Sequence, residues 1–335
     1  MGPRRRLNLA YFHNMHNWSS YGVPRSLLEA LRWRGHEVTA FRMDRFQAKP
    51  AKTSPQSPDL LKPTLVGSAF TEASRPDAIL FASSGLAFPE KEMARLRKWG
   101  TVLVGFGFSD PRWYETKVRP IIPLFDLFFT LCPEVHDAWQ HASVDVRRML
   151  PSIHDGFHKR TTSWDMRHGI MFVGLGKGHP DYPSRLATLR SLRKAGIPVA
   201  VYGRRWRALP DGRRGPAHGD ELIKVLNAHR IGLDLGAAGA ISRRVFEYAA
   251  CGALVVLPEG NRLATDVWGD PGVSHLAYRD SDHLVAILRG VKKGEIPAQE
   301  IAERGCKEVY ARHRISSRAA EIEKALLAHI PTRSP

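Results

Sequence analysis

The chain opens with a mostly apolar run, an amphipathic segment and a second run of mixed character. Residues 7–12 are apolar except Asn8, and residues 24–34 carry apolar side chains at helical spacing before Gly35. The segment HEVTAFRM that follows predicts a strand. A strand, a helix, a glycine and a strand in this order predict a βαβ unit and therefore a parallel sheet.

The same rhythm returns twice, first after residue 76 and again after residue 168. In the first half, DAILFAS, TVLVGFGF and FDLFFTL predict strands, and PEKEMARLRKWG predicts a helix. In the second half, GIMFVGL, IPVAVYG and IGLDLG predict strands, which alternate with helices at YPSRLATLRSLRKAG and GDELIKVLNAH. This pattern predicts an α/β chain with two doubly wound, Rossmann-like units.

Composition along the chain predicts where these units begin and end. Residues 46–76 are rich in proline and predict an irregular excursion, whereas the polar residues 151–168 have no period and predict a linker. We expect an N-terminal domain at residues 1–157, a linker at 158–168 and a C-terminal domain at 169–315. Residues 316–335 predict a C-terminal helix that packs back on the N-terminal domain.

Length and hydropathy are those of a globular chain without a membrane span. The 335 residues suffice for two hydrophobic cores, and no apolar run reaches the roughly 18 residues that a span needs. The start, MGPRRRLNLAYFH, is basic, but its apolar stretch is too short for a signal peptide. We therefore expect a cytoplasmic protein whose cysteines are free thiols.

Residues 241–260, ISRRVFEYAACGALVVLPEG, carry the clearest chemical signal in the chain. Ser242 is placed to cap a helix whose first backbone N–H groups stay free for an anion. Glu247 follows one turn later, and the small residues 251–253 end the helix before an apolar strand. Free N–H groups suit phosphate and a carboxylate suits a ribose diol, so the segment predicts a nucleotide diphosphate site.

This segment resembles the donor site of glycosyltransferases with the GT-B architecture. The narrower resemblance is to the branch of spore maturation protein CgeB and glycosyltransferase family 1-like proteins. GLDLGAAGAISRRVFEYAACGALVV is similar to their donor-binding segment, and MFVGLGKGHP, FDLFFTLCPEVHDAWQ and VRRMLPSIHDGFH also match, so the likeness covers most of residues 77–330. It implies a nucleotide-sugar donor on the C-terminal Rossmann-like domain, an acceptor on the N-terminal one, and ligands in a cleft that faces the carboxyl ends of both sheets.

Individual donor contacts follow from the motif and from the resemblance. Glu247 would accept hydrogen bonds from the donor ribose, and the alternative is an i, i+4 ion pair with Arg243 on a solvated helix. Many retaining enzymes have a second glutamate eight positions earlier, where this chain has Gly239, so retention and inversion both stay open. The other expected donor contacts are Ser242, Arg243, Arg244, Gly174, Lys177, Tyr202, Gly203 and Arg204.

The arginines at the start of this helix can hold two phosphates and stabilise the departing nucleotide in place of a metal ion. The histidines show no H-E-x-x-H or similar ligand spacing. We expect a UDP-sugar as donor, no metal site and no further cofactor.

Three residues of the N-terminal half are candidates for the base that deprotonates an acceptor hydroxyl. Asp110 ends the strand TVLVGFGF, and acidic residues at that end of a strand face the ligand. The alternative for Asp110 is a turn cap before Pro111. His13 and His16, in the loop after the first strand, are the other candidates.

The net charge of +17 is evenly spread, since residues 1–160 carry +8 and residues 161–335 carry +9. Such a field attracts polyanions, although a basic, solvated surface is the alternative. The densest cluster has an interleaved tryptophan, as nucleic-acid sites do, and a solvent-facing loop has the same composition. The cluster comprises Arg204, Arg205, Trp206, Arg207, Arg213 and Arg214.

Three classes of function remain after these observations. The leading hypothesis is a metal-independent glycosyltransferase with a polyanionic acceptor. Because some relatives resemble phage enzymes that glycosylate DNA bases, a hydroxylated DNA base is favoured over an anionic envelope polymer or a lipid-linked acceptor. The other classes are a non-catalytic protein that binds nucleic acid or nucleotide sugar, and a sugar-nucleotide epimerase.

Overall fold

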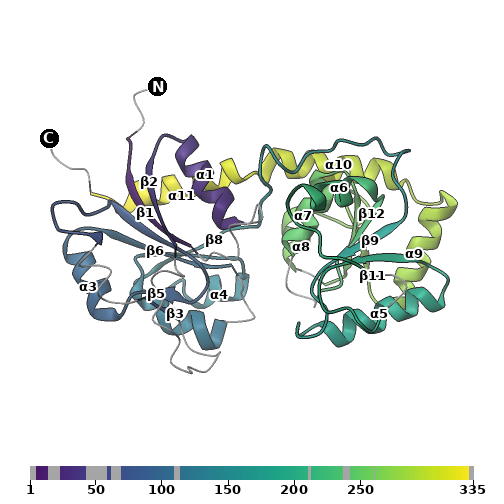
Figure 1. Ribbon diagram of the computed structural model, residues 1–335, viewed down its shortest axis with the longest axis horizontal. Coiled ribbons are helices and arrows are strands. Elements are labelled where there is room, and N and C mark those ends of the chain that lie inside the picture. The colour runs from purple at the N-terminus through teal and green to yellow at the C-terminus, as the bar shows by residue number, and fades with distance from the viewer. Residues whose placement is uncertain are drawn as a thin grey trace. The chain divides into compact units, whose positions relative to one another are not determined.

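The computed structural model describes residues 5–13, 23–42, 59–61, 69–108, 114–209, 213–236, 242–260 and 262–331. The chain divides into two compact units (Figure 1). Residues 1–150 and 315–335 form the N-terminal unit, and residues 151–314 form the C-terminal unit.

The N-terminal unit is built on a parallel sheet whose described strands run in the order β2-β1-β4-β6-β7-β8. A separate parallel pair joins β3 to β5. The elements are β1 (Asn8–His13), α1 (Val23–Trp33), β2 (Glu37–Arg42), β3 (Asp59–Leu60), β4 (Ala78–Ala82), β5 (Leu86–Ala87), α3 (Glu90–Lys98), β6 (Val102–Gly107), a π-helical turn (Tyr114–Val118), a 3-10 helix (Arg119–Leu124), β7 (Leu127–Thr130), α4 (Pro133–Ala138), β8 (Asp145–Arg148) and α11 (Ile315–His329).

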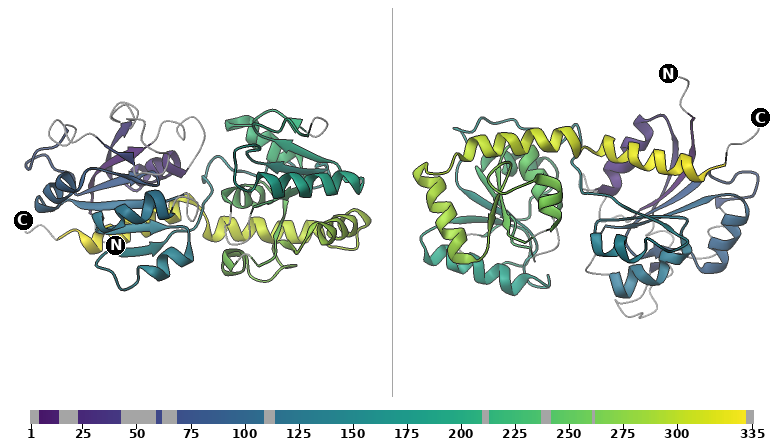
Figure 2. Two further views of the ribbon diagram at one scale, coloured as in Figure 1. Left: turned by 90° about the horizontal axis from the view of Figure 1, so that it is seen from below. Right: turned by 180° about the vertical axis from the view of Figure 1, so that it is seen from behind.

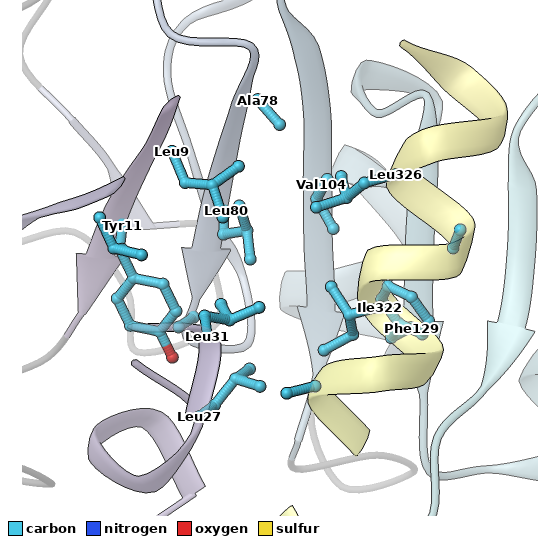
Figure 3. Packing of buried hydrophobic residues seen from close by; sticks show 14 of the residues in the cluster. Leu9, Tyr11, Leu27, Leu31, Ala78, Leu80, Val104, Phe129, Ile322 and Leu326 are labelled. Atoms are coloured by element: carbon cyan, nitrogen blue, oxygen red, sulfur yellow. The ribbon is translucent and has the colours of Figure 1, made fainter. Parts of the chain in front are cut away.

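Side chains alternate between two cores, one on each face of this sheet, because successive strand residues point to opposite faces. In β1, Leu9 and Tyr11 enter the core beneath α1 and α11, whereas Ala10 and Phe12 enter the core beneath α3. Figure 3 shows the first of these cores, in which the side chains of α11 point toward β6. The C-terminal helix is thus part of the N-terminal core.

The C-terminal unit has a second parallel sheet, with its described strands in the order β11-β10-β9-β12-β13-β14. Its elements are β9 (Ile170–Val173), α5 (Tyr182–Lys194), β10 (Val199–Tyr202), β11 (Arg213–Arg214), α6 (Gly219–Ala228), β12 (Ile231–Leu233), α7 (Arg243–Ala250), β13 (Leu254–Pro258), α8 (Arg262–Trp268), β14 (Leu276–Tyr278), α9 (Ser281–Lys293) and α10 (Ala298–Arg312). Counted along the chain, this is the 3-2-1-4-5-6 order of a dinucleotide-binding Rossmann sheet.

Helices cover both faces of the C-terminal sheet, as a doubly wound fold requires (Figure 2). Apolar side chains of α5 and α9 pack in the core on one face. On the other face, α7 lies beside α10, and α10 also contacts β13. The predicted α/β class with two doubly wound sheets is confirmed.

The predicted end of the N-terminal domain at residue 157 and the predicted linker at 158–168 are wrong, because residues 151–168 belong to the C-terminal unit. Arg167 is fully buried there, and its guanidinium donates to the carbonyl oxygens of Thr162 and Cys251. The Asn227 side chain accepts from the backbone N–H of Thr161 at 2.7 Å and donates to the carbonyl of Lys159 at 2.9 Å. Polar residues that would suit a solvated linker are here used as buried hydrogen-bond partners.

Among the helices of the described residues, none has the length and apolar character to cross a membrane.

We predict that the protein loses stability as the pH falls below about 6.5, in part through His275. Its imidazole is 2% exposed, and burial lowers its pKa to about 4 from a usual 6.5. Because the folded pKa is the lower one, the unfolded chain binds the proton more tightly. The contribution of His275 is therefore complete above pH 6.5 and is lost as the pH falls toward 4.

Urea unfolding between about pH 7 and pH 4 measures this effect. The free energy of unfolding should fall by up to about 1.4 kcal/mol per pH unit for this group. His275→Leu should flatten that dependence, and the same change at the exposed His141 should not. Identical pH profiles for wild type and His275→Leu would contradict the assignment.

Candidate functional site

Three loops meet at the carboxyl ends of β9, β10 and β12, where the strand order of the C-terminal sheet reverses. Residues 174–178 follow β9, residues 203–209 follow β10 and residues 234–236 follow β12. Ligands of doubly wound sheets bind outside the carboxyl ends of the strands at this point. The sequence-predicted donor residues lie on these loops, at the end of β10 or in the first two turns of α7 with its cap, so the fold brings them to one edge of one sheet.

The first two loops are joined by backbone contacts that require glycine. Gly203 has φ +145°, and a Cβ there would lie 1.9 Å from the carbonyl oxygen of Gly174. The N–H of Gly176 donates to the carbonyl of Arg204 at 2.9 Å, and that of Lys177 donates to the carbonyl of Arg205 at 3.0 Å. Gly174 and Gly203 thus hold a fixed close approach between the loops.

The prediction that Trp206 belongs to a nucleic-acid surface is wrong. Its side chain is fully buried, and its indole N–H donates to the carbonyl of Gly174 at 2.8 Å. The ring packs edge-on against Phe172, with centroids 5.7 Å apart, and lies tilted against Tyr182, with centroids 5.5 Å apart. Trp206 therefore belongs to the core beneath the loops, and a base has no face of it to stack on.

The basic residues around Trp206 are mostly at the surface. Lys177, Arg204, Arg205, Arg207 and Arg214 are exposed. The backbone of Arg205 has φ +64°, a left-handed conformation that is costly for a residue other than glycine and that is held here by the bond from Lys177. The backbone of Arg213 lies in β11, and its side chain lies outside the described residues.

Tyr202, predicted to border the donor base, is the last residue of β10. Its ring is half-buried and lies edge-on to His229, with centroids 5.6 Å apart. Burial raises the pKa of its hydroxyl. The contact of Tyr202 with a base stays a prediction.

Ser242 caps α7, as its position in the sequence predicts. Its backbone is extended, with φ −74° and ψ 140°, and its hydroxyl accepts a hydrogen bond from the N–H of Arg244 at 3.2 Å. The helix therefore begins at Arg243 and directs its first N–H groups toward the carboxyl edge of the sheet. This end of a helix attracts anions.

Glu247 is fully buried, and its carboxylate is surrounded by three basic side chains. Oε2 pairs with Arg244 Nη1, while Oε1 lies 3.0 Å from Arg243 Nε and 3.4 Å from His158 Nε2. Burial alone would raise the pKa of the carboxyl, but these partners hold it well below its usual range. The glutamate is therefore ionised, and its charge orients the two arginines on the first turn of α7.

The parts of this cluster that reach the surface belong to the two arginine side chains. The side chains of Arg243 and Arg244 keep 26% and 24% of their surface exposed, whereas that of Glu247 keeps 1%. The solvated i, i+4 pair considered for Arg243 and Glu247 is thus replaced by a buried cluster. A ligand at this edge meets the arginines before it meets the carboxylate.

His158 takes part in this cluster although the sequence analysis did not select it. It is 2% exposed and lies in residues 151–168, which were assigned to the domain end and the linker. The only signal for it was its place in the segment VRRMLPSIHDGFH, which matched the family without a role. A histidine in a polar stretch without a period gives no sign that it will be buried.

Arg185 and Asp234 bind backbone groups of the loops after β9 and β12. Neither residue was among the candidates from the sequence. Arg185 donates to the carbonyl of Leu235 at 3.2 Å and to that of Leu175 at 3.3 Å, so it ties the loop after β12 to the loop after β9. Asp234 Oδ1 accepts from the N–H of Gly236 at 3.0 Å, and burial raises the pKa of this carboxyl. Both are buried polar side chains that bind backbone groups of these loops, and such contacts are not revealed by local sequence patterns.

Tyr248 of α7 contacts both central strands of the sheet, β9 and β12. Its hydroxyl accepts a hydrogen bond from the N–H of Val173 at 2.9 Å, beyond the last β9–β12 pair. Its ring lies on Gly232, where a Cβ would approach within 2.5 Å. The tyrosine thus holds α7 against the reversal point of the sheet.

Of the three candidate bases of the N-terminal unit, the structure describes His13 alone. His13 is the last residue of β1, and its side chain is 1% exposed. Asp110 and His16 lie outside the described residues. The role of each as a general base stays a prediction.

Among the described residues, no group of three or more His, Cys, Asp and Glu side chains is placed to hold a metal ion.

Comparison with known proteins relates this arrangement to one family. Residues 185–324, which include α7 and the cluster residues Arg243, Arg244 and Glu247, match the family described as glycosyl transferase-like. Three solved structures are similar over almost the whole chain. The chain has the GT-B fold of these glycosyltransferases. The predicted resemblance to GT-B glycosyltransferases is thereby confirmed.

The similar structures have little sequence in common with this chain. Sucrose-phosphate synthase from Thermosynechococcus elongatus is 13% identical with a TM-score of 0.65, and 96% of this chain and 100% of that chain are covered. A glycosyltransferase from Rickettsia africae is 10% identical with a TM-score of 0.68, covering 97% and 99%. Anabaena HepE, in complex with UDP and glucose, is 13% identical with a TM-score of 0.67, covering 96% and 100%. The search of curated proteins gave no match.

We predict that Glu247→Ala destabilises the protein by about 3–5 kcal/mol, the cost of removing one partner from a buried ion pair. The change would remove the carboxylate that pairs with both Arg243 and Arg244. This differs from the expectation for a solvent-facing carboxylate, whose removal leaves the fold intact.

Urea unfolding measures the loss, with Glu221→Ala as the control. Glu221 pairs with Lys224 at 3.8 Å on the exposed face of α6, so its removal should cost about 1 kcal/mol or less. Equal and small losses in the two variants would mean that the cluster around Glu247 contributes no more than a surface pair.

Proposed function

We propose that this protein is a glycosyltransferase that moves a sugar from a nucleotide diphosphate sugar to an acceptor hydroxyl. The observation that carries the proposal is the capped start of α7, where Arg243 and Arg244 are oriented by the buried Glu247 at the reversal point of a Rossmann sheet. The glycosyl transferase-like match over residues 185–324 and the GT-B fold support the same class.

The charges around the site favour a diphosphate. Burial lowers the pKa of His218, and Arg204 and Arg244 lower it further, so both cations act on this residue at the start of α6. Arg243 and the exposed Lys177 add positive charge from two further positions. Guanidinium groups and helix N–H groups stabilise the negative charge that develops on a departing nucleoside diphosphate. We propose that they do so here without a metal ion.

The buried position of Glu247 changes the role that we propose for it. Its carboxylate is fully covered, so a ribose reaches it only by displacing an arginine. We propose that Glu247 acts on the donor chiefly by orienting Arg243 and Arg244. UDP is the nucleotide to test first, because HepE was solved with UDP and glucose.

The proposal for the acceptor side of the reaction rests on the sequence. We propose Asp110 as the base that removes the acceptor proton, with His13 and His16 as the alternatives. Asp110→Asn would then abolish transfer without changing donor affinity. The choice between a retaining and an inverting reaction is part of the same question, since only an inverting enzyme needs this base.

We predict that Arg244→Gln weakens UDP binding at least tenfold, which corresponds to about 1.4 kcal/mol. The substitution removes a charged donor from the diphosphate but keeps a polar side chain of similar length. Lys224→Gln on the exposed face of α6 is the matched control and should bind UDP as the wild type does. Calorimetric titration measures both dissociation constants.

Turnover separates the possible classes of function. The protein is mixed with UDP-sugars and GDP-sugars, and nucleotide release is followed with and without acceptors. Acceptor-dependent release supports the transferase, and isomerisation without an acceptor indicates an epimerase. Nucleotide binding without either reaction would leave a non-catalytic binding protein, and unchanged UDP affinity in Arg244→Gln would remove the arginine from the donor site.

The acceptor that we propose is a polyanion, because of the evenly spread charge of +17 and the exposed arginines 204, 205, 207 and 214. Among polyanions we favour DNA with a hydroxylated base, which would have to leave the helical stack to react. An anionic envelope polymer or a lipid-linked acceptor is the second candidate on the same charge.

We predict that duplex DNA binding falls steeply between about 50 and 200 mM salt, because each phosphate that is neutralised releases a counterion. A charge-reduced variant, Arg205→Gln with Arg207→Gln, should show a shallower slope. The Lys224→Gln variant controls for the loss of one unrelated charge. Absent or salt-insensitive DNA binding, together with tight binding to anionic vesicles, would favour the lipid-linked acceptor.

A further inference from the structure

We propose that His158 is a positioning residue of the donor site, which holds the Glu247 carboxylate so that Arg243 and Arg244 face the diphosphate. This inference rests on the proposed donor function of α7. It adds a residue from a segment outside the donor motif, and it assigns that residue an action through two others.

The hydrogen bonds of His158 fix where its proton lies. Nδ1 accepts a hydrogen bond from the backbone N–H of His154 at 3.0 Å. A neutral imidazole that accepts at one nitrogen carries its proton on the other, so the N–H is on Nε2. Burial lowers the pKa of His158 in spite of the adjacent carboxylate, which favours this neutral form.

The protonated nitrogen faces the glutamate. Nε2 lies 3.4 Å from Glu247 Oε1, the oxygen that also lies 3.0 Å from Arg243 Nε. The other oxygen, Oε2, pairs with Arg244. The carboxylate is thus contacted from one side by the imidazole and from the other by two guanidinium groups, and its rotation is restricted by all three.

The contacts run from buried side chains to partly exposed ones. The side chains of His158 and Glu247 are 2% and 1% exposed, whereas the arginines keep about a quarter of their surface. A ligand at the start of α7 can touch the arginines but not the imidazole. Any effect of His158 on such a ligand must therefore pass through Glu247.

The backbone of His158 is held independently of its ring. Its carbonyl accepts a hydrogen bond from the hydroxyl of Tyr310 on α10, and its N–H donates to the carbonyl of His154 at 3.2 Å. The ring of Phe157 lies edge-on to the imidazole, with centroids 5.2 Å apart. The imidazole therefore keeps one orientation, as a positioning group requires.

Two amide substitutions test the roles of the two ring nitrogens of His158 separately. In His158→Gln the amide nitrogen reaches the place of Nε2 and keeps the contact with Glu247. In His158→Asn the shorter amide reaches only the place of Nδ1, so it keeps the bond from His154 and loses Glu247. Both variants are polar and of similar size, so a general structural effect should be similar in the two.

The test measures binding of inorganic pyrophosphate, UDP and uridine by calorimetry and competition. We expect His158→Asn to weaken pyrophosphate and UDP at least tenfold and to change uridine less than twofold. His158→Gln should stay within threefold of wild type for all three probes. His275→Leu, which changes another fully buried histidine of the same unit, should bind all three as the wild type does.

Each outcome decides the inference. Equal affinities of His158→Asn and wild type for pyrophosphate would overturn it while the donor site stands. Equal losses in His158→Asn and His158→Gln, or a loss of uridine as large as that of UDP, would also overturn it, since both indicate a purely structural histidine. Failure of the wild type to bind pyrophosphate and UDP would overturn the proposed function together with the role of His158.

Discussion

The buried carboxylate of Glu247 is the interaction on which the candidate site depends. An ionised carboxylate is costly to bury unless charged and polar partners replace its water. Arg243, Arg244 and His158 supply them, and each comes with constraints of its own. The side chains of the arginines, which belong to the first turn of α7, turn toward the carboxylate. The imidazole of His158 contacts the same carboxylate from another segment. One desolvated charge therefore joins the two arginines of the helix start to a histidine from a distant segment.

The frame around this cluster consists of close contacts at glycines and of side-chain hydrogen bonds to main-chain carbonyls. Gly203 approaches the carbonyl of Gly174, and the ring of Tyr248 lies on Gly232. Arg185 then joins the loops after β9 and β12 through their carbonyl oxygens. Because these contacts involve main-chain atoms, the loops keep their shape whichever side chains they present. The exposed cations are thus carried on a rigid support, which limits the entropy lost when a ligand binds.

Burial by distant partners also explains two differences between the predictions from the sequence and the structure. Trp206, between arginines, has the composition of a nucleic-acid surface, but its large ring fills the core beneath the loops. Residues 151–168 have the composition of a linker, but the buried side chains of Arg167 and Asn227 hold them by hydrogen bonds to their backbone. In both cases the composition predicted residues exposed to solvent. Long-range partners, which composition does not record, supplied the burial.

The sequence by itself determined the order of strands and helices, the two parallel sheets and the cap at Ser242. These features depend on local periodicity, on glycine stops and on neighbours within one turn, all of which are written in consecutive residues. It also placed Glu247 beside Arg243 and Arg244, because they share one helical turn. Only the tertiary structure brought His158 to that carboxylate and Arg185 to two loops, and only it buried Trp206. Those contacts join residues far apart in the chain, so they exist only once the sheet has brought its carboxyl edge together.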